Sequence, residues 1–303
     1  MKVFVVGATG YIGFNVACAF RRAGHEVWGL ARSEAKAREL ARHEVRPVMG
    51  TLQEPASYLA AARVCSLLVH CAADWQADTM ALDRVTIDAL LGAGDKSHAR
   101  PTFIYTSGVW IQGATGPHPA DETAPLAPPA FLALRPEHER LVLGSPAVRG
   151  IVLRPGCVYG KSGGLTGMWF APAAKDEEVR LIAGGHNRWA TVHVDDLAEA
   201  YVRTAECGVE GEVLLLADGS RATVAEMAAA AVRAAGSSSK LALWPLAEAS
   251  RAMGSYADGL ALDQAVDARK AERVLAWRPR HRGFVDEVDV YFAAWKSHQA
   301  ATA

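Results

Sequence analysis

The sequence lacks several features that would place it in specialised classes of protein. No apolar run approaches the ~20 residues that a bilayer-spanning helix requires. The first apolar run is too short for a signal peptide and leads directly into a glycine turn. The 32 Lys and Arg balance 33 Asp and Glu, so the net charge is −1, without the basic excess of a nucleic-acid binder. We therefore expect a cytoplasmic protein that has no membrane span and binds no nucleic acid.

Cysteine is also sparse and unpaired. The five cysteines show no spacing typical of a zinc site, so we expect reduced thiols and no metal. Half of the 303 residues are hydrophobic, which is enough for a sizeable core. The cysteines are Cys18, Cys65, Cys71, Cys157 and Cys207.

The chain does contain a regular alternation of short apolar runs and helical patterns. The apolar runs lack an in-and-out alternation, as expected for strands that helices cover on both faces. The pattern predicts an α/β fold, a Rossmann-type doubly wound parallel sheet. Strands are expected at 3–6, 26–30, 45–48, 66–70, 102–106 and 151–154, and helices at 11–23, 33–41, 55–62, 79–92 and before residue 143.

The regularity falls after Arg154, which predicts a second, smaller part. Residues 1–160 are expected to form the dinucleotide-binding domain, to which 186–220 return with strands at 191–194 and 212–216. Residues 161–185 and 221–303 are expected to form a smaller, mainly helical substrate-binding lobe. The five prolines of 116–129 indicate a surface loop.

The first strand leads into a glycine-rich turn, Gly7-Ala8-Thr9-Gly10-Tyr11-Ile12-Gly13, which opens a helix. Gly7 permits the tight turn, Gly10 lets the backbone approach a phosphate, and Gly13 lets the helix pack on the strand. The free N–H groups of the helix start then face a diphosphate. We predict that this turn, including Thr9, Tyr11 and Ile12, binds the pyrophosphate of a nicotinamide dinucleotide. An ordinary glycine-rich strand-helix turn is the alternative.

The end of the second strand indicates which nicotinamide cofactor binds. An NAD site would place Asp or Glu here for the ribose 2′-hydroxyl, and residues 28–33 contain no acid. Arg32 follows the strand, where a guanidinium can bind a 2′-phosphate, and Ser33 can add a hydroxyl. NADP(H) is therefore favoured over NAD(H). The alternative is that Arg32 is a surface residue and Ser33 only caps the next helix.

Five segments in order resemble the extended short-chain dehydrogenase/reductase superfamily, in its NAD-dependent epimerase/reductase branch. They are the glycine turn 7–13 and the segments 69–73, 104–108, 153–160 and 192–198. The resemblance covers about two thirds of the chain and implies a nicotinamide-dependent oxidoreductase, with a homodimer as the family's common state. It also implies cofactor contacts from Thr51, Leu52, Cys71, Ala72, Ala73, Arg135, Pro155, Gly156 and Val158.

The catalytic Tyr-x-x-x-Lys pair of that superfamily is absent. With Glu139 as a marker, the tyrosine position is Phe131 and the lysine position is Arg135. Phenylalanine has no exchangeable proton and cannot act as the general acid. No tyrosine in the chain has a lysine four residues later, so the loss of the pair does not depend on this alignment.

Other side chains are candidates for the chemistry. Ser107 can hydrogen-bond a substrate oxygen, and Arg135 can keep a ribose contact and stabilise negative charge. His138 lies one turn beyond Arg135 and can reach the cleft, and His193 is a further candidate. A structural role for each histidine is the alternative.

Aromatic residues at positions expected near the cleft indicate a flat or apolar substrate. Ordinary core packing is the alternative, and a lid is expected where Trp169 and Phe170 follow a glycine-rich connection. The aromatic residues are Trp75, Trp110, Phe131, Trp169 and Phe170.

Three functions follow from these features. The first is an NADPH-dependent reductase of a hydrophobic or aromatic carbonyl or conjugated small molecule, in specialised metabolism, with a non-standard proton donor. The second is a non-catalytic NADP(H)-binding sensor or scaffold, suggested by the missing Tyr and Lys. The third is a nucleotide-sugar epimerase or dehydratase, which the missing tyrosine disfavours.

Overall fold

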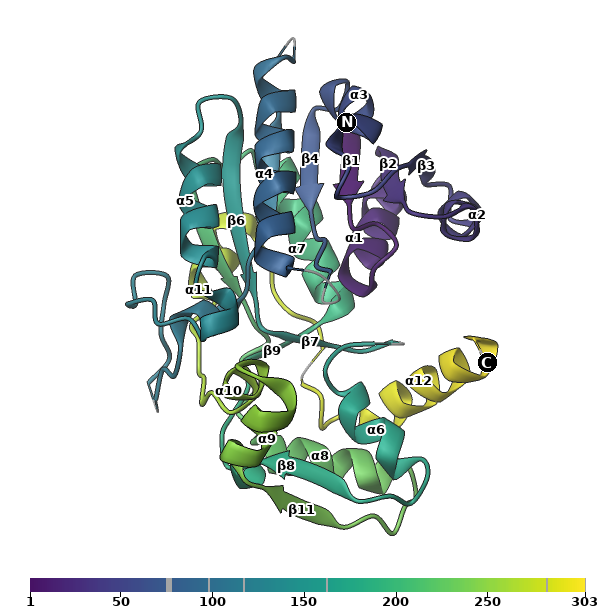
Figure 1. Ribbon diagram of the computed structural model, residues 1–303, viewed down its shortest axis with the longest axis vertical. Coiled ribbons are helices and arrows are strands. Elements are labelled where there is room, and N and C mark those ends of the chain that lie inside the picture. Colours follow the sequence, from purple (N-terminus) through teal and green to yellow (C-terminus); the bar gives the residue numbers. More distant parts are fainter. Residues whose placement is uncertain (75–77, 98, 117, 162, 282, 303) are drawn as a thin grey trace.

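A seven-stranded, fully parallel sheet forms the centre of the protein (Figure 1). The structure is a computed structural model that describes residues 1–302 apart from 75–77, 98, 117, 162 and 282. The strand order β10-β6-β5-β4-β1-β2-β3 reverses direction between β1 and β4, as in a Rossmann fold. The predicted fold class is confirmed. The strands are β1 (Lys2–Val6), β2 (Glu26–Ala31), β3 (Arg46–Met49), β4 (Leu67–His70), β5 (Thr102–Thr106), β6 (Arg149–Pro155) and β10 (Val213–Leu216).

Helices cover both faces of this sheet. Along β1, Val3 and Val5 pack into one core, and Phe4 and Val6 into the core on the opposite face. This explains why the strands read as continuous apolar runs. The first face is covered by α1 (Tyr11–Arg22), α2 (Glu34–Arg42), α7 (Val194–Glu206) and α11 (Arg269–Leu275), and the second by α3 (Leu59–Arg63), α4 (Thr79–Asp95) and α5 (Arg135–Gly144).

A smaller part lies below the sheet in Figure 1 and has its own buried core. In it, β8 (Val179–Ile182) pairs with β11 (Leu241–Trp244). A second pair, β7 (Cys157–Tyr159) with β9 (Thr191–His193), joins the two parts. The helices of the smaller part are α6 (Gly167–Ala173), α8 (Val224–Ala234), α9 (Leu246–Met253), α10 (Tyr256–Leu260) and α12 (Val288–Thr302).

Two features of this part differ from the expectation. Helix α11 belongs to the range 221–303 but packs on α7 and β10, and Trp277 after it donates its indole N–H to the Asp196 carbonyl oxygen at 2.9 Å. Trp169 and Phe170 form no lid, because both are buried in the core of the smaller part. In that core they pack against other aromatic side chains, such as Trp189, whose ring lies 5.3 Å from that of Trp169.

Side-chain hydrogen bonds cap the starts of two helices that cover the sheet. Ser33 caps α2, as predicted, by accepting from the Lys36 N–H. Helix α7 is capped by His193, whose ring accepts from the Asp195 N–H. In the part of the chain that the structure describes, no helix has both the length and the apolar character needed to cross a membrane.

Candidate functional site

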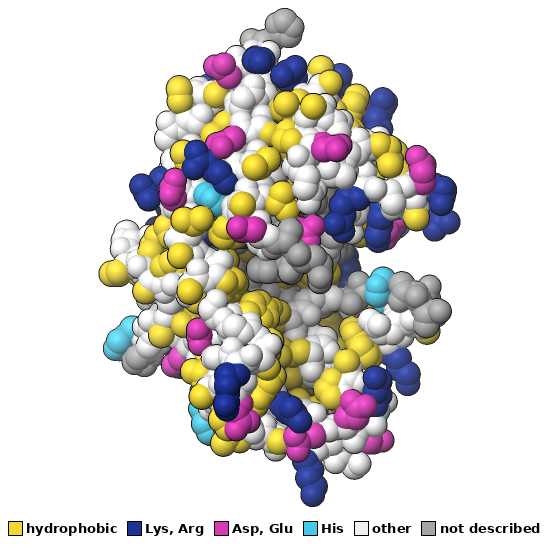
Figure 2. Space-filling view, viewed as in Figure 1, with side chains coloured by type: hydrophobic (Ala, Val, Ile, Leu, Met, Phe, Trp, Pro, Cys, Tyr) yellow, Lys and Arg dark blue, Asp and Glu magenta, His cyan; other side chains and the backbone are white. Residues whose placement is uncertain are grey.

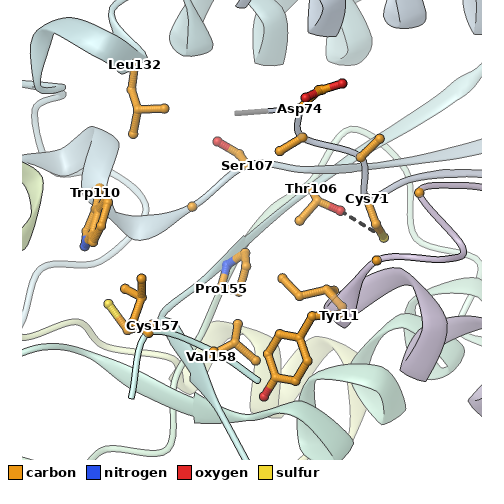
Figure 3. A pocket seen from close by; sticks show the side chains of 18 of the residues that line it. Tyr11, Cys71, Asp74, Thr106, Ser107, Trp110, Leu132, Pro155, Cys157 and Val158 are labelled. Atoms are coloured by element: carbon orange, nitrogen blue, oxygen red, sulfur yellow. Dashed lines mark hydrogen bonds between the residues drawn. The ribbon is translucent and has the colours of Figure 1, made fainter. Parts of the chain in front are cut away.

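A cavity of about 510 Å³ opens at the carboxyl ends of the strands, where the sheet order reverses. This is the position at which open α/β sheets bind ligands. Figure 2 shows a hollow between the upper and lower parts of the molecule, with Lys and Arg side chains on the border where Figure 1 places α2. In Figure 3, Cys71 and Tyr11 lie on one side of the cavity and Trp110 and Cys157 on the other.

The glycine turn forms one end of this cavity with the geometry that a phosphate requires. Gly7 has φ +89°, and a Cβ there would lie 2.7 Å from the Ala72 nitrogen. A Cβ on Gly13 would lie 2.2 Å from the Gly7 oxygen, so Gly13 serves helix packing and does not line the cavity. Helix α1 starts after Gly10 with no side-chain cap and no acidic residue in its first turn. Its free N–H groups therefore suit a diphosphate, and Thr9, Tyr11 and Ile12 line the cavity beside them.

Cations border the cavity at the end of β2. Arg32 lines it, two thirds exposed, with Nη1 3.3 Å from Oδ2 of Asp74. Lys36, one turn further along, also lines it. Sequence reasoning missed Lys36, although its spacing of four residues from Arg32 on a helix start was a usable signal.

Besides Gly13, two residues expected to bind the cofactor do not line the cavity. The hydroxyl of Ser33 is used as the cap of α2, as the alternative reading held. Thr51 donates its N–H to Ser57 Oγ at 3.3 Å, whereas its neighbour Leu52 does line the cavity. The wall of the cavity therefore differs from the expected set at these two positions.

The remaining expected contacts converge on the middle of the cavity. Tyr11 donates its hydroxyl to the Gly160 carbonyl at 2.7 Å, and Thr106 donates to Cys71 Sγ at 3.3 Å (Figure 3). A Cβ on Gly156 would lie 2.5 Å from the Ala190 oxygen, so only glycine fits. The expected residues in this wall are Cys71, Ala72, Ala73, Pro155, Gly156 and Val158.

Ser107 and Arg135 also line the cavity. The Ser107 hydroxyl is buried and has no hydrogen-bond partner among the described residues. A buried polar group of this kind is suited to a ligand oxygen. Arg135 opens α5, donates through Nη1 to the Thr106 carbonyl at 3.1 Å, and lies under the cavity with 8 % of its surface exposed.

His138 does not reach the cleft, which corrects the expectation for this residue. Its ring is buried on the inner side of α5, with Nδ1 2.8 Å from Oδ2 of Asp83. His70 and Tyr105 also bond this carboxylate, and Arg135 Nε lies 3.9 Å away. Burial opposes ionisation of Asp83, but the hydrogen bonds of both histidines and the charge of Arg135 hold its pKa well below its usual value. Asp83 thus supplies a buried counter-charge behind Arg135.

His193 lies outside the cavity as well. Besides capping α7, it stacks on His281 with ring centroids 3.5 Å apart. Burial, followed by the charge of His281, lowers its pKa to about 4. His193 is therefore neutral in the folded protein at neutral pH and has a structural role.

The end of the cavity away from α2 is apolar and aromatic. Trp110, Phe131 and Tyr256 stand edge to face, with ring centroids 5.5–6.0 Å apart. Leu132 and Leu165 complete this wall. Tyr256 comes from α10 of the smaller part, and no local pattern in the sequence could associate it with residues so distant along the chain. Trp75, also expected here, lies outside the described residues.

The residues present fit a nicotinamide dinucleotide, whose diphosphate the glycine turn and the start of α1 would hold. When bound, such a cofactor supplies or accepts a hydride. The protein would bind and orient it, the aromatic wall would exclude water, and the Ser107 hydroxyl and the Arg135 charge would be available to a substrate oxygen.

Comparison with known proteins agrees with this geometry. The model of the NAD dependent epimerase/dehydratase family matches residues 3–217. A ketoreductase of 4-hydroxy-2-methyl-3-oxo-4-farnesyl-3,4-dihydroquinoline-1-oxide from Stigmatella aurantiaca is 29% identical, over 73% of this chain and 69% of the relative. A 3-diazoavenalumate denitrifying reductase from Streptomyces sp is 29% identical, over 94% of this chain and 98% of the relative.

Solved structures share the fold over nearly the whole chain. A dTDP-glucose 4,6-dehydratase from Streptomyces venezuelae, with NAD bound, superposes with a TM-score of 0.85 at 18% identity, over 99% of this chain and 98% of the other. A UDP-glucose 4-epimerase from Thermotoga maritima gives 0.83 at 18% identity, over 99% and 100%. At this identity the likeness establishes the fold alone.

Proposed function

Because the chain belongs to the NAD-dependent epimerase/dehydratase family, we propose that it is an NADPH-dependent reductase of hydrophobic or aromatic carbonyl or conjugated small molecules. Membership confirms the resemblance stated from the motifs. It also identifies an NAD(P)-dependent enzyme of the oxidoreductase type, in place of a non-catalytic sensor. The observation that carries the proposal is the single cavity that joins the glycine turn to an aromatic wall.

The preference for NADPH rests on charge at the end of β2. Residues 28–33, at the end of this strand, contain no acid to accept from a ribose 2′-hydroxyl, and Arg32 and Lys36 both line the cavity. The carboxylate nearest to Arg32, that of Asp74, is paired with it, so the cation also shields this negative charge. Lys36 is likewise paired, with Nζ 2.7 Å from Oε2 of Glu39, and both cations are exposed enough to turn toward a 2′-phosphate.

The substrate class rests on the aromatic wall. Trp110, Phe131 and Tyr256 present ring surfaces on which a flat or apolar molecule can pack. The names of the two relatives agree with a reductase, since one is a ketoreductase of a farnesyl-dihydroquinoline-1-oxide and the other a 3-diazoavenalumate denitrifying reductase. Ser107 would hydrogen-bond the substrate oxygen, and Arg135 would hold the nicotinamide ribose and stabilise developing negative charge.

Epimerase or dehydratase chemistry fits this site less well. A nucleotide-sugar enzyme needs a base that removes a hydroxyl proton before hydride leaves. Phe131 occupies the position of that tyrosine and cannot accept a proton.

The test is deuteride transfer from 4-deuterated NADPH to a panel of aromatic ketones, quinones and conjugated ring compounds. UDP-glucose with the oxidised cofactor, assayed for epimerisation or loss of water, is the sugar-nucleotide contrast. We expect deuterium in at least one apolar product and no conversion of the sugar. Trp110→Leu should raise KM for that acceptor about tenfold, since an aromatic contact contributes about 0.5–1.5 kcal/mol. Trp244→Leu, on β11 outside the cavity wall, is the matched control. Absence of transfer to every apolar acceptor would refute the proposal.

A further inference from the structure

The cavity contains few groups that could supply a proton to a reduced substrate. Two tyrosines line it among the described residues, Tyr11 and Tyr256. The hydroxyl of Tyr11 is already donated to the Gly160 carbonyl at 2.7 Å. Two thiols, those of Cys71 and Cys157, also line the cavity, and the Cys71 sulfur accepts a hydrogen bond from Thr106 at 3.3 Å.

Tyr256 stands beside the position where the resemblance expects a tyrosine. Its ring lies 5.5 Å from that of Phe131, at an interplanar angle of 66°. The ring of Trp110 lies 5.7 Å from that of Tyr256 and 6.0 Å from that of Phe131, so the three rings contact one another. The smaller part of the molecule thus brings a phenol into the same wall from which the superfamily's phenol has been lost.

We propose that Tyr256 is the proton donor of the reduction, in place of the absent tyrosine of the Tyr-x-x-x-Lys pair. The step rests on the function proposed above. Hydride from the reduced nicotinamide bonds to the carbonyl carbon, the C–O π electrons move to oxygen, and that oxygen takes the hydroxyl proton of Tyr256. The cofactor leaves oxidised, the substrate leaves as the alcohol, and water reprotonates the phenolate.

The surroundings of Tyr256 suit this role. Burial, followed by the proximity of Cys157, raises its pKa to about 12, so the phenol is protonated at neutral pH. The positive charge of the oxidised nicotinamide would stabilise the transient phenolate. Ser107 would hold the substrate oxygen during the transfer.

Tyr256→Phe tests the hydroxyl while keeping the ring and its packing. We expect kcat to fall by about 100-fold or more, the usual contribution of general acid catalysis, with KM and NADPH affinity changed less than threefold. The solvent deuterium isotope effect on kcat should change with it. Tyr291→Phe is the matched control, because its hydroxyl bonds Glu287 and does not line the cavity. Adding Phe131→Tyr to Tyr256→Phe should restore part of kcat.

A second readout needs no turnover. The tyrosinate absorbance near 295 nm, taken as wild type minus Tyr256→Phe, reports the titration of this phenol alone. NADP⁺ should move its midpoint down by about one pH unit, because a positive charge enters the cavity beside it. A midpoint that NADP⁺ leaves unchanged, or a kcat that Tyr256→Phe leaves within twofold, would overturn the assignment. If no acceptor on the panel is reduced but NADP⁺ lowers the midpoint, the proposed substrate class is wrong. The shift would still support the position of Tyr256 beside the nicotinamide.

Discussion

Arg32→Ala should separate the two nicotinamide cofactors. Arg32 is two thirds exposed, so its charge acts through solvent, where two unit charges 4 Å apart interact by about 1 kcal/mol. A 2′-phosphate carries about −1.5 to −2 charges, which gives about 2 kcal/mol. The variant also removes the cation 3.3 Å from Asp74, so the negative charge of this carboxylate would be less shielded from the phosphate.

The expected result is a Kd for NADPH that rises about 30-fold, since about 1.4 kcal/mol corresponds to a factor of ten. The Kd for NADH should change less than threefold. Tryptophan fluorescence quenching measures both, and the NADPH effect should shrink at high salt because exposed charges are screened.

Arg38→Ala is the matched control, since it removes the same charge from α2 at an exposed position that does not line the cavity. Equal losses for NADPH and NADH in Arg32→Ala would refute the reasoning. An equal loss of NADPH affinity in Arg38→Ala would also refute it. The loss would then come from the overall positive charge of α2 and not from a contact between Arg32 and the 2′-phosphate.

Three further predictions concern the turn and the buried charges. Gly7→Ala should abolish binding of either cofactor by calorimetry, because φ is +89° and the new Cβ would lie 2.7 Å from the Ala72 nitrogen. Since burial and then His281 lower the pKa of His193 to about 4, against ~6.5 unfolded, stability should be fully present above pH ~6.5 and fall as the pH drops toward 4. In urea unfolding the wild type should lose about 2 kcal/mol more than His193→Asn between pH 7 and 4.5, and equal slopes would contradict this. Asp83→Asn should destabilise the fold by about 3 kcal/mol at pH 7 and flatten its acid dependence below pH ~4, whereas a loss under 1 kcal/mol would show that the carboxylate is not needed.

The sequence by itself determined the parts that depend on local physics. The strands of the sheet follow from short apolar runs, and the turn at Gly7 follows from a backbone that only glycine adopts readily. Ser33 caps its helix because its hydroxyl reaches an N–H three residues away. The absence of Asp and Glu from residues 28–33 is equally evident from the sequence, because it concerns a single short segment at the end of β2.

Only the tertiary structure decided which side chains meet in the cavity. Helical spacing placed His138 near Arg135, but the partner that turns its ring inward is Asp83, on another helix. Tyr256 reaches the wall beside Phe131 because the smaller part packs at the end of the sheet where the cavity opens. Contacts of this kind depend on the packing of distant segments, and no periodicity or motif along the chain records them.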